Sequence, residues 1–373
     1  MQIRASAYLV MKVKDTDAQP ELSIAGLTSN KIKNMQILNL ELRSDTFTKP
    51  TKAMLEAMFN ADVGDDVFEE DASTKDLEQQ AAAMFGYEAG LFCMSGTMAN
   101  QIAIKIHTQP GDEVICDALS HIYLYEGGGI ATNSLVSVHL INGDRGRISA
   151  EQVAENIKVD NVHYPITRLV SLENTVNKGG GCIYDMHEIQ KIKNVCTTNN
   201  LKLHLDGARI FNAIVATKEQ PRKYGELFDT ISVCLSKGLG TPMGSVLLGT
   251  KEFIHAARRV RKRLGGGWRQ SGYLAAAGIY ALNNHINRLA EDHTRAKELA
   301  TIFSALPEVK HILPVDTNIV IFELEERLLS QDFVNSLMEK GIKTSPFGKH
   351  QVRLVTHLDF GDAELEAVRQ ILK

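Results

Sequence analysis

The sequence has few cysteines, and none of them stands in a pattern that holds a metal ion or a disulfide framework. Five occur among 373 residues, scattered and odd in number, with no CxxC motif. They are Cys93, Cys116, Cys182, Cys196 and Cys234. Zinc sites and disulfide frameworks use paired, regularly spaced cysteines. We therefore expect reduced and buried thiols, no metal site and a cytoplasmic location.

Long apolar runs and an excess of one charge are also missing. The longest clear apolar stretch, Leu274–Leu282, has nine residues, whereas a membrane-spanning helix needs about 20. The 41 basic and 45 acidic residues give a net charge of −4 (41 − 45). Bulk electrostatics therefore favour neither nucleic acid nor an acidic membrane as a partner. Any phosphate that the chain recognises must be bound by a local pocket.

The length and the changes of pattern along the chain indicate two domains after an irregular start. Residues 1–34 show no sustained apolar period, and we expect an extension without regular structure or a start-site artefact. We expect residues 35–60 to pack on a small domain and residues 61–285 to form a large one. Residues 286–373 then form the small α+β domain.

Strand-like and helix-like segments alternate between about residues 75 and 250. The expected strands are Ala89–Met94, Glu113–Cys116, Val136–Leu140, Leu169–Leu172, Leu201–Leu205, Thr230–Leu235 and Val246–Leu248. This alternation is typical of an α/β fold with a mostly parallel, seven-stranded sheet covered by helices. A helical stretch over residues 270–304 follows. Ligands of such sheets bind beyond the carboxyl ends of the strands, where Glu173, Asp206 and Lys237 stand.

Lys237 and Asp206 are the strongest candidates for chemistry. Lys237 ends a strand and is followed by Gly238 and Gly240, a placement that suits Schiff-base chemistry. Asp206 ends the strand 31 residues earlier (237 − 206), and an acid there can keep a pyridine nitrogen protonated. A surface lysine in a turn and an aspartate that caps a helix remain the alternatives.

Phosphate binding would need donors, and two segments offer them. Gly96 and Thr97 begin a helix, whose N-terminus supplies free N–H groups, although ordinary Ser/Thr capping explains the same residues. Arg269 follows three glycines at the end of a basic run that contains Lys262. Such runs are most often solvated helix faces, but Arg269 could reach a phosphate across a subunit boundary.

Two histidines and one arginine are further candidates for the site. His121 precedes a glycine-rich segment, where an imidazole can stack on a planar cofactor or move a proton. His163 has the same imidazole side chain, but no glycine-rich segment follows it. Arg353 lies inside the expected strand Val352–Thr356, where it either faces solvent or binds an anion.

Seven motifs, in order, carry a resemblance to a known family over about residues 36–373. They are Leu42-Arg-Ser-Asp-Thr46, Val63-Gly-Asp-Asp-Val67, Ser171-Leu-Glu-Asn-Thr175, His204-Leu-Asp-Gly-Ala-Arg-Ile-Phe-Asn212, Leu235-Ser-Lys-Gly-Leu-Gly-Thr-Pro242, Arg269-Gln-Ser-Gly272 and Arg353-Leu-Val-Thr-His-Leu-Asp359. The sequence resembles the low-specificity L-threonine aldolases, a group within the β-eliminating lyase and aminotransferase-like family. These are pyridoxal 5′-phosphate enzymes of fold type I. Val176 stands where that family usually has histidine.

The resemblance implies a role for each candidate. Lys237 would attach the cofactor covalently, Asp206 would pair with its ring nitrogen, and His121 would stack on its ring. The phosphate would be bound by Gly96, Thr97 and Arg269. The amino-acid carboxylate would be held by Ser44, Arg209 and Arg353, with Arg209 alternatively on the cofactor's phenolic oxygen. His121 and His163 would surround the substrate hydroxyl, and Tyr125 and Lys262 would reach the site from a partner subunit.

The function implied is cleavage of L-threonine or L-allo-threonine into glycine and acetaldehyde by a dimer or tetramer with shared sites. The base that deprotonates the hydroxyl is left open among His121, His163 and a water between them. Other reactions on the same cofactor (β-elimination, transamination or racemisation) use the same lysine and acid, and a catalytically silent cofactor-binding protein is a further alternative.

Overall fold

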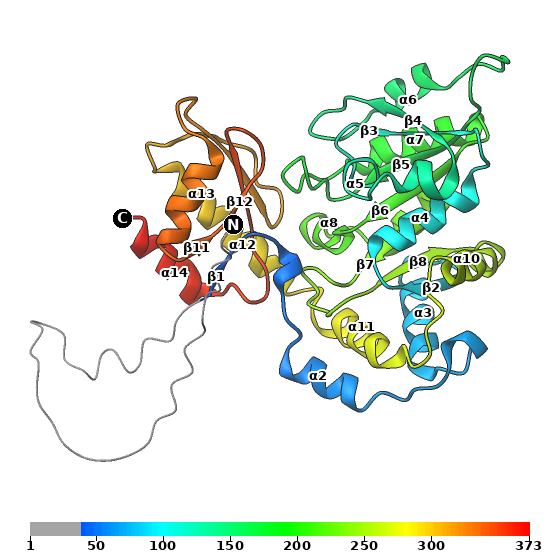
Figure 1. Ribbon diagram of the computed structural model, residues 1–373, viewed down its shortest axis with the longest axis horizontal. Helices are drawn as coiled ribbons and strands as arrows, with labels where there is room; N and C mark the ends of the chain where they lie inside the picture. The colour runs from blue at the N-terminus through cyan, green and yellow to red at the C-terminus, as the bar shows by residue number, and fades with distance from the viewer. Residues whose placement is uncertain (1–38) are drawn as a thin grey trace, which may run out of the picture. The chain divides into compact units, whose positions relative to one another are not determined.

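The structure is a computed structural model that describes residues 39–373 (Figure 1). These residues form one unit that contains a large seven-stranded sheet and a smaller four-stranded sheet. The extension that we expect over residues 1–34 lies outside the described residues. No helix in the described part is long and apolar enough to cross a membrane.

The large sheet confirms the mostly parallel α/β fold. In spatial order its strands are β2 (Ala89–Cys93), β8 (Ser245–Gly249), β7 (Thr230–Cys234), β6 (Lys202–Gly207), β5 (Thr167–Glu173), β3 (Glu113–Asp117) and β4 (Ser137–Ile141). All seven match expected strands within a few residues. β8 alone runs antiparallel to its neighbours β7 and β2, because the short loop between β7 and β8 contains no crossover helix.

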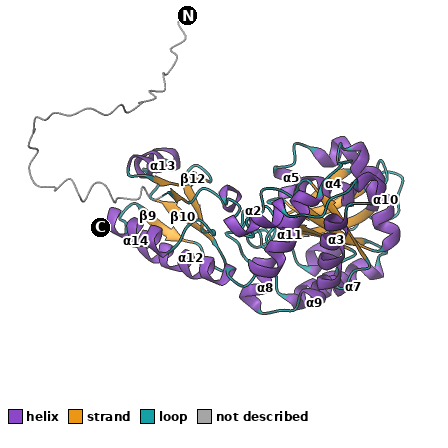
Figure 2. Ribbon diagram, turned by 90° about the horizontal axis from the view of Figure 1, so that it is seen from below, coloured by secondary structure: helices purple, strands orange, loops and turns teal. Residues whose placement is uncertain are grey.

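Helices cover both faces of the large sheet (Figure 2). They are α3 (Ala72–Phe85), α4 (Gly96–His107), α6 (Ala150–Asn156), α7 (Met186–Thr198), α8 (Ile210–Thr217), α9 (Pro221–Leu227) and α10 (Lys251–Arg263), with a short α5 (His121–Leu124) and a π-helical turn η3 (Ile130–Ser134). α4 and α10 pack on the face that carries Leu91 and Leu247, whereas Phe92 and Leu248 pack on the α3 side. Successive strand residues therefore point to opposite faces.

The expected helical stretch over residues 270–304 is two helices instead of one. α11 (Gly272–Asn284) ends at two asparagines, and α12 (Leu289–Ser304) begins after a break of four residues. Asparagine has weak helix propensity, and the His285 ring bonds the carbonyl of Leu239 at 2.7 Å. This contact stabilises the break.

The smaller sheet contains β12 (Ser345–Pro346), β13 (Gln351–Val355), β10 (Ile319–Leu324) and β9 (Val309–Ile312), all antiparallel. It packs with α12 and α13 (Ser330–Glu339), while α14 (Asp362–Ile371) packs on α12, and this arrangement confirms the small α+β domain. β1 (Leu40–Glu41) pairs with β11 (Ile342–Lys343), while α2 (Lys52–Phe59) packs on α11. The described residues of the expected N-terminal segment, 39–60, thus contribute to both parts, and the exact domain limits stay a prediction.

Candidate active site

Lys237 and Asp206 lie at the carboxyl edge of the large sheet. Asp206 is buried near the end of β6, and Lys237 lies three residues beyond the end of β7. The Lys237 ammonium contacts the Cys234 sulfur at 3.2 Å. Burial alone would lower the pKa of Lys237, but Cys234 and the carboxylates of Asp45 and Asp206 outweigh it, so the pKa is raised. Lys237 is therefore held as an ammonium ion in the field of Asp45 and Asp206.

All five cysteines are buried and free, as expected. Cys234 differs from the others in its titration. Burial raises the pKa of Cys93, Cys116 and Cys196 to about 12. For Cys234 the effect of burial is outweighed by the neighbouring Lys237, and its pKa is lowered.

Arg209 is paired with an aspartate that the residue-by-residue reading did not single out. Its Nε and Nη2 donate to the two carboxylate oxygens of Asp45, both at 2.7 Å. Burial would raise the pKa of Asp45, but Arg209 outweighs it and holds the pKa at about 2. This fork of Arg209 is occupied, so a ligand is left with the two N–H groups of Nη1 and the second N–H of Nη2. Ser44, next to Asp45, caps η1 (Asp45–Phe47) with its hydroxyl.

Arg353 has the geometry that suits a carboxylate ligand. Its side chain extends from β13 to two other segments of the chain. Nη1 donates to Asn177 Oδ1 at 2.8 Å, and Nη2 donates to the carbonyl of Arg43 at 3.0 Å. Its Nε is buried and has no hydrogen-bond partner among the described residues. Burial, with the nearby Arg209 charge, lowers the pKa of Arg353 to about 10. An unpaired guanidinium edge beside another cation favours an anion there.

We expect Arg353→Lys to raise KM for the amino acid and to lower kcat as well. Lysine cannot reproduce the planar fork, so it loses a charge-assisted bond of about 1.5–3 kcal/mol and misorients the substrate. Steady-state kinetics of purified protein measure both constants. Arg147→Lys, which changes an arginine bonded to Asp144 and Ile183 away from this site, is the matched control. Unchanged constants for Arg353→Lys would remove Arg353 from the site.

His121 and two glutamates form the side of the site next to Asp206. His121 Nδ1 lies 3.1 Å from Glu126 Oε1, and its backbone N–H donates to Glu173 at 2.8 Å. Burial would lower the pKa of His121, but Glu126, Asp206 and Glu173 outweigh it and raise the pKa. The second ring nitrogen, Nε2, is left for a ligand, so His121 can move a proton there.

Burial, followed by the charge of Asp206, raises the pKa of Glu173 to about 7. The folded state thus favours protonated Glu173, and the unfolded state loses this proton at lower pH. We expect the free energy of unfolding to fall as the pH rises from about 4.5 to about 7. Urea unfolding at pH 5 and pH 8 should show a larger fall for the wild type than for Glu173→Gln. An equal fall in both proteins would contradict the assignment.

The start of α4 could hold a phosphate. Ser95 caps the helix by accepting from Met98 N, which leaves the N–H groups of Gly96 and Thr97 free of that role. A Cβ placed on Gly96 would meet only the Ser245 hydroxyl, at 3.7 Å. That hydroxyl is buried without a partner among the described residues. Together with Lys237 and Asp206, these groups fit pyridoxal 5′-phosphate.

The structure places the four remaining expected site residues as follows. His163 is exposed in the turn before β5, at the opposite end of the strand from Glu173, so this chain does not bring it to its own site. The Tyr125 ring lies 5.6 Å from the His121 ring of the same chain, and its role from a partner subunit stays a prediction. Arg269 is exposed and pairs with Asp65, and Lys262 is exposed on α10.

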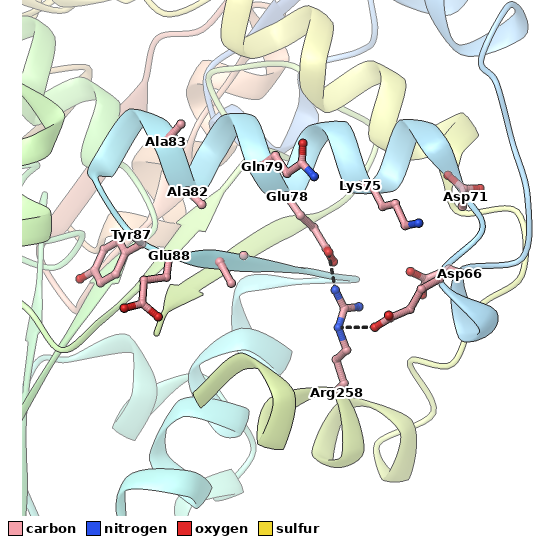
Figure 3. A pocket seen from close by; sticks show the side chains of 13 residues that line it. Asp66, Asp71, Lys75, Glu78, Gln79, Ala82, Ala83, Tyr87, Glu88 and Arg258 are labelled. Carbon is pink, nitrogen blue, oxygen red and sulfur yellow. Dashed lines mark hydrogen bonds and ion pairs between the residues drawn. The ribbon is translucent and has the colours of Figure 1, made fainter. Parts of the chain in front are cut away.

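A hollow of about 490 Å³ between α3 and α10 is separate from this site (Figure 3). Arg258 crosses it and bonds Glu78 at 2.6 Å and Glu69 at 3.2 Å. Glu78 also accepts the backbone N–H of Phe92. These contacts tie the loop before α3 to β2 and α10. The hollow is not lined by Lys237 or Asp206.

The comparison with family models decides the relationship. The model described as beta-eliminating lyase matches residues 41–327. The chain belongs to this family. Membership makes it a lyase and implies dependence on pyridoxal 5′-phosphate, which the residues at the carboxyl edge of the sheet fit. The resemblance noted from the seven motifs is thereby confirmed.

Individual relatives agree with the family model. The low-specificity L-threonine aldolase of Escherichia coli (strain K12) is 41% identical over 332 residues, covering 88% of this chain and 97% of the relative. The enzyme of the same name from Saccharomyces cerevisiae is 43% identical, covering 81% and 78%. The threonine aldolase of Leishmania major superposes with a TM-score of 0.75 at 19% identity, covering 89% and 99%. This last likeness confirms the fold.

Proposed function

We propose that this chain cleaves L-threonine, or its allo isomer, to glycine and acetaldehyde with pyridoxal 5′-phosphate. The observation that carries the proposal is the grouping of Lys237, Asp206 and His121 at one edge of the sheet, beside the buried Arg209 and the half-buried Arg353. The names of relatives about 40% identical over most of the chain support the same substrate. Bound cofactor would act as an electron sink that lets a bond to the substrate Cα break.

The substrate carboxylate binds at Arg353 in this proposal. The free Nε edge of Arg353 and the Nη1 of Arg209 supply donors, and Ser44 lies beside Asp45 at the same place. Fixing the carboxylate selects which bond of Cα is aligned for cleavage. With the cofactor bound, Asp206 would pair with its ring nitrogen and favour the protonated form of the ring, which draws electrons away from Cα.

His121 is our candidate base for the substrate hydroxyl. Glu126 holds the ring through Nδ1, so Nε2 remains to take the proton from the hydroxyl as the Cα–Cβ bond breaks. The carboxylate partner raises the basicity of the imidazole, as in other histidine–carboxylate pairs. His163 of the same chain lies at the far end of β5, which leaves His121 or a water bound to it.

Purified protein loaded with pyridoxal 5′-phosphate and mixed with L-threonine tests the function. We expect acetaldehyde and glycine in equal amounts. The family also suggests elimination of water from threonine, which would give 2-oxobutyrate and ammonia instead. Release of 2-oxobutyrate without acetaldehyde would replace aldol cleavage by β-elimination. Parallel assays with L-allo-threonine decide which of the two isomers is the better substrate.

A location in the cytoplasm stays a prediction.

We further propose that two or more copies of the chain share their active sites. Arg269 and Lys262 are exposed cations on the loop and helix next to the glycine run. Their exposure leaves them available to a phosphate bound by another copy. The hydrophobic side chains Val67 and Phe68 are exposed nearby on the loop that Asp65 begins, as expected of a surface that becomes covered.

Mixing two inactive variants tests this sharing. Lys237→Ala subunits keep Arg269, and Arg269→Ala subunits keep Lys237. If sites are shared, a mixed dimer contains one complete site, and we expect the mixture to recover up to about half of the activity per mixed dimer. Sedimentation of the wild type should show at least a dimer. A fully active monomer would contradict the proposal.

A further inference from the structure

A buried row of polar side chains extends inward from Asp206 between the sheet and α4. His204 lies two residues before Asp206 on β6, so both side chains point to the same face, whereas Leu203 and Leu205 enter the opposite core. Thr230 on β7 is the register partner of His204. These residues are almost fully buried, with exposed fractions of 0% for His204 and Thr230 and 2% for Asp206.

α4 supplies two further members of the row. Asn100 and His107 are seven residues apart (107 − 100), about two helical turns, so they share the face that packs on the sheet. Asn100 lies near Asp206, and His107 lies at the end of the helix beside Thr230. The side chains therefore form one line of hydrogen bonds below the helix.

The orientation of Asn100 follows from its partners. Its side-chain nitrogen lies 2.9 Å from Asp206 Oδ2 and 3.0 Å from Glu126 Oε1. Both carboxylates accept, so the Asn100 amide must donate to them. Its oxygen Oδ1 then faces His204 Nε2 at 3.1 Å and must accept. His204 therefore carries its proton on Nε2.

The rest of the row is fixed by the same reasoning. Burial, with His107 nearby, lowers the pKa of His204 to about 3, so the ring is neutral and its Nδ1 accepts. The Thr230 hydroxyl, 2.9 Å away, donates to that Nδ1. Thr230 in turn accepts from His107 Nε2 at 2.9 Å. Every bond donates in the direction of Asp206.

We infer that Asn100 and His204 are positioning residues that hold the Asp206 carboxylate aimed at the cofactor's ring nitrogen. A line of bonds that all donate toward a carboxylate stabilises its charged form, and each bond polarises the next in a low-dielectric interior. The bond from Asn100 to Glu126 extends the same control to His121. The inference rests on the proposed function for the identity of the group that Asp206 holds.

Two substitutions at His204 separate donation from packing. His204→Phe keeps a planar ring but leaves Asn100 Oδ1 without a donor, and His204→Gln restores an N–H near the position of Nε2. We expect kcat of His204→Phe to fall about 10–100-fold, with KM near that of the wild type because His204 touches no substrate. His204→Gln should recover most of this loss. His139→Phe removes a histidine–asparagine bond on β4, outside the row, and is the matched control.

Nitrogen NMR gives readouts that a purely structural role would not move. In the ¹⁵N-histidine-labelled wild type without cofactor, His204 should be neutral with its proton on Nε2. With pyridoxal 5′-phosphate labelled at its ring nitrogen, the ¹⁵N signal should be that of a protonated ring in the wild type. In His204→Phe the ring-nitrogen signal should shift toward the value of an unprotonated ring. In His204→Gln the signal should return to the wild-type value.

Two results would overturn the inference. One is a proton found on His204 Nδ1 in the wild type. The other is a cofactor ring-nitrogen signal that is the same in His204→Phe and in the wild type, even if kcat of the variant falls. If His204→Phe does not fold, the wild-type tautomer and the ring-nitrogen signal of His204→Gln decide. Absence of acetaldehyde with the wild type would instead contradict the proposed function, and the NMR signals would still test the row.

Discussion

Replacing Lys237 by alanine is expected to lower threonine cleavage about 10³-fold or more, while the protein still binds pyridoxal 5′-phosphate without a covalent link. The lysine amine contacts the Cys234 sulfur and lies in the field of the Asp45 and Asp206 carboxylates. Borohydride reduction of the loaded wild type, followed by peptide mapping, should place the pyridoxyl group on Lys237. Activity of the variant is measured as acetaldehyde released per folded subunit.

Two controls distinguish covalent attachment from loss of charge. Lys237→Arg keeps a cation near Cys234 but cannot form the link, so it should be as inactive as the alanine variant. Lys202→Ala removes a lysine at the opposite end of β6, where it pairs with Asp229, and should keep both the label and the activity. A pyridoxyl group on any other lysine would contradict the assignment.

Asp206→Asn is expected to lower kcat by about 10²–10³-fold, the second largest effect. An asparagine has nearly the same shape but carries no charge to hold a protonated ring nitrogen. Its amide would also face the donating amide of Asn100, because Asp206 Oδ1 already accepts from Ala208 N. Steady-state kinetics and the absorption spectrum of the bound cofactor measure the change.

Asp117→Asn is the matched control for this prediction. Asp117 is another buried carboxylate at a strand end, but its oxygens accept the backbone N–H groups of Leu119 and Gly143. We expect Asp117→Asn to lower stability with little effect on kcat of the folded fraction. If kcat of Asp206→Asn stays within about twofold of the wild type, Asp206 does not act on the ring nitrogen.

The strands of the large sheet were predictable from the sequence because they are short apolar segments bounded by turns and helices. Each expected strand lies within a few residues of an observed one. The direction of β8 was not predictable, since a strand of this length has the same pattern in either direction. The edge strands β9 and β12 were missed because they are short and partly exposed, which weakens the alternation on which prediction depends.

Part of the candidate site was also visible in the sequence. Lys237 and Asp206 end strands, and parallel strands that end together bring their last residues to one edge. Asn100 and His204 left a weaker signal, a seven-residue spacing to His107 on the helix and a two-residue spacing to Asp206 on the strand. For Glu126 the sequence offered no signal beyond its closeness to His121, five residues away (126 − 121).

The sequence by itself determined the alternation of strands and helices, the strand-end places of Lys237 and Asp206, and the family through its ordered motifs. Only the tertiary structure decided the pairings. Asp45 and Arg209 are 164 residues apart in the chain, and Arg353 and Asn177 are 176 apart. Local patterns fix which way a side chain points from its own element. Which side chains meet depends on how distant segments pack, because that packing alone sets the distances between them.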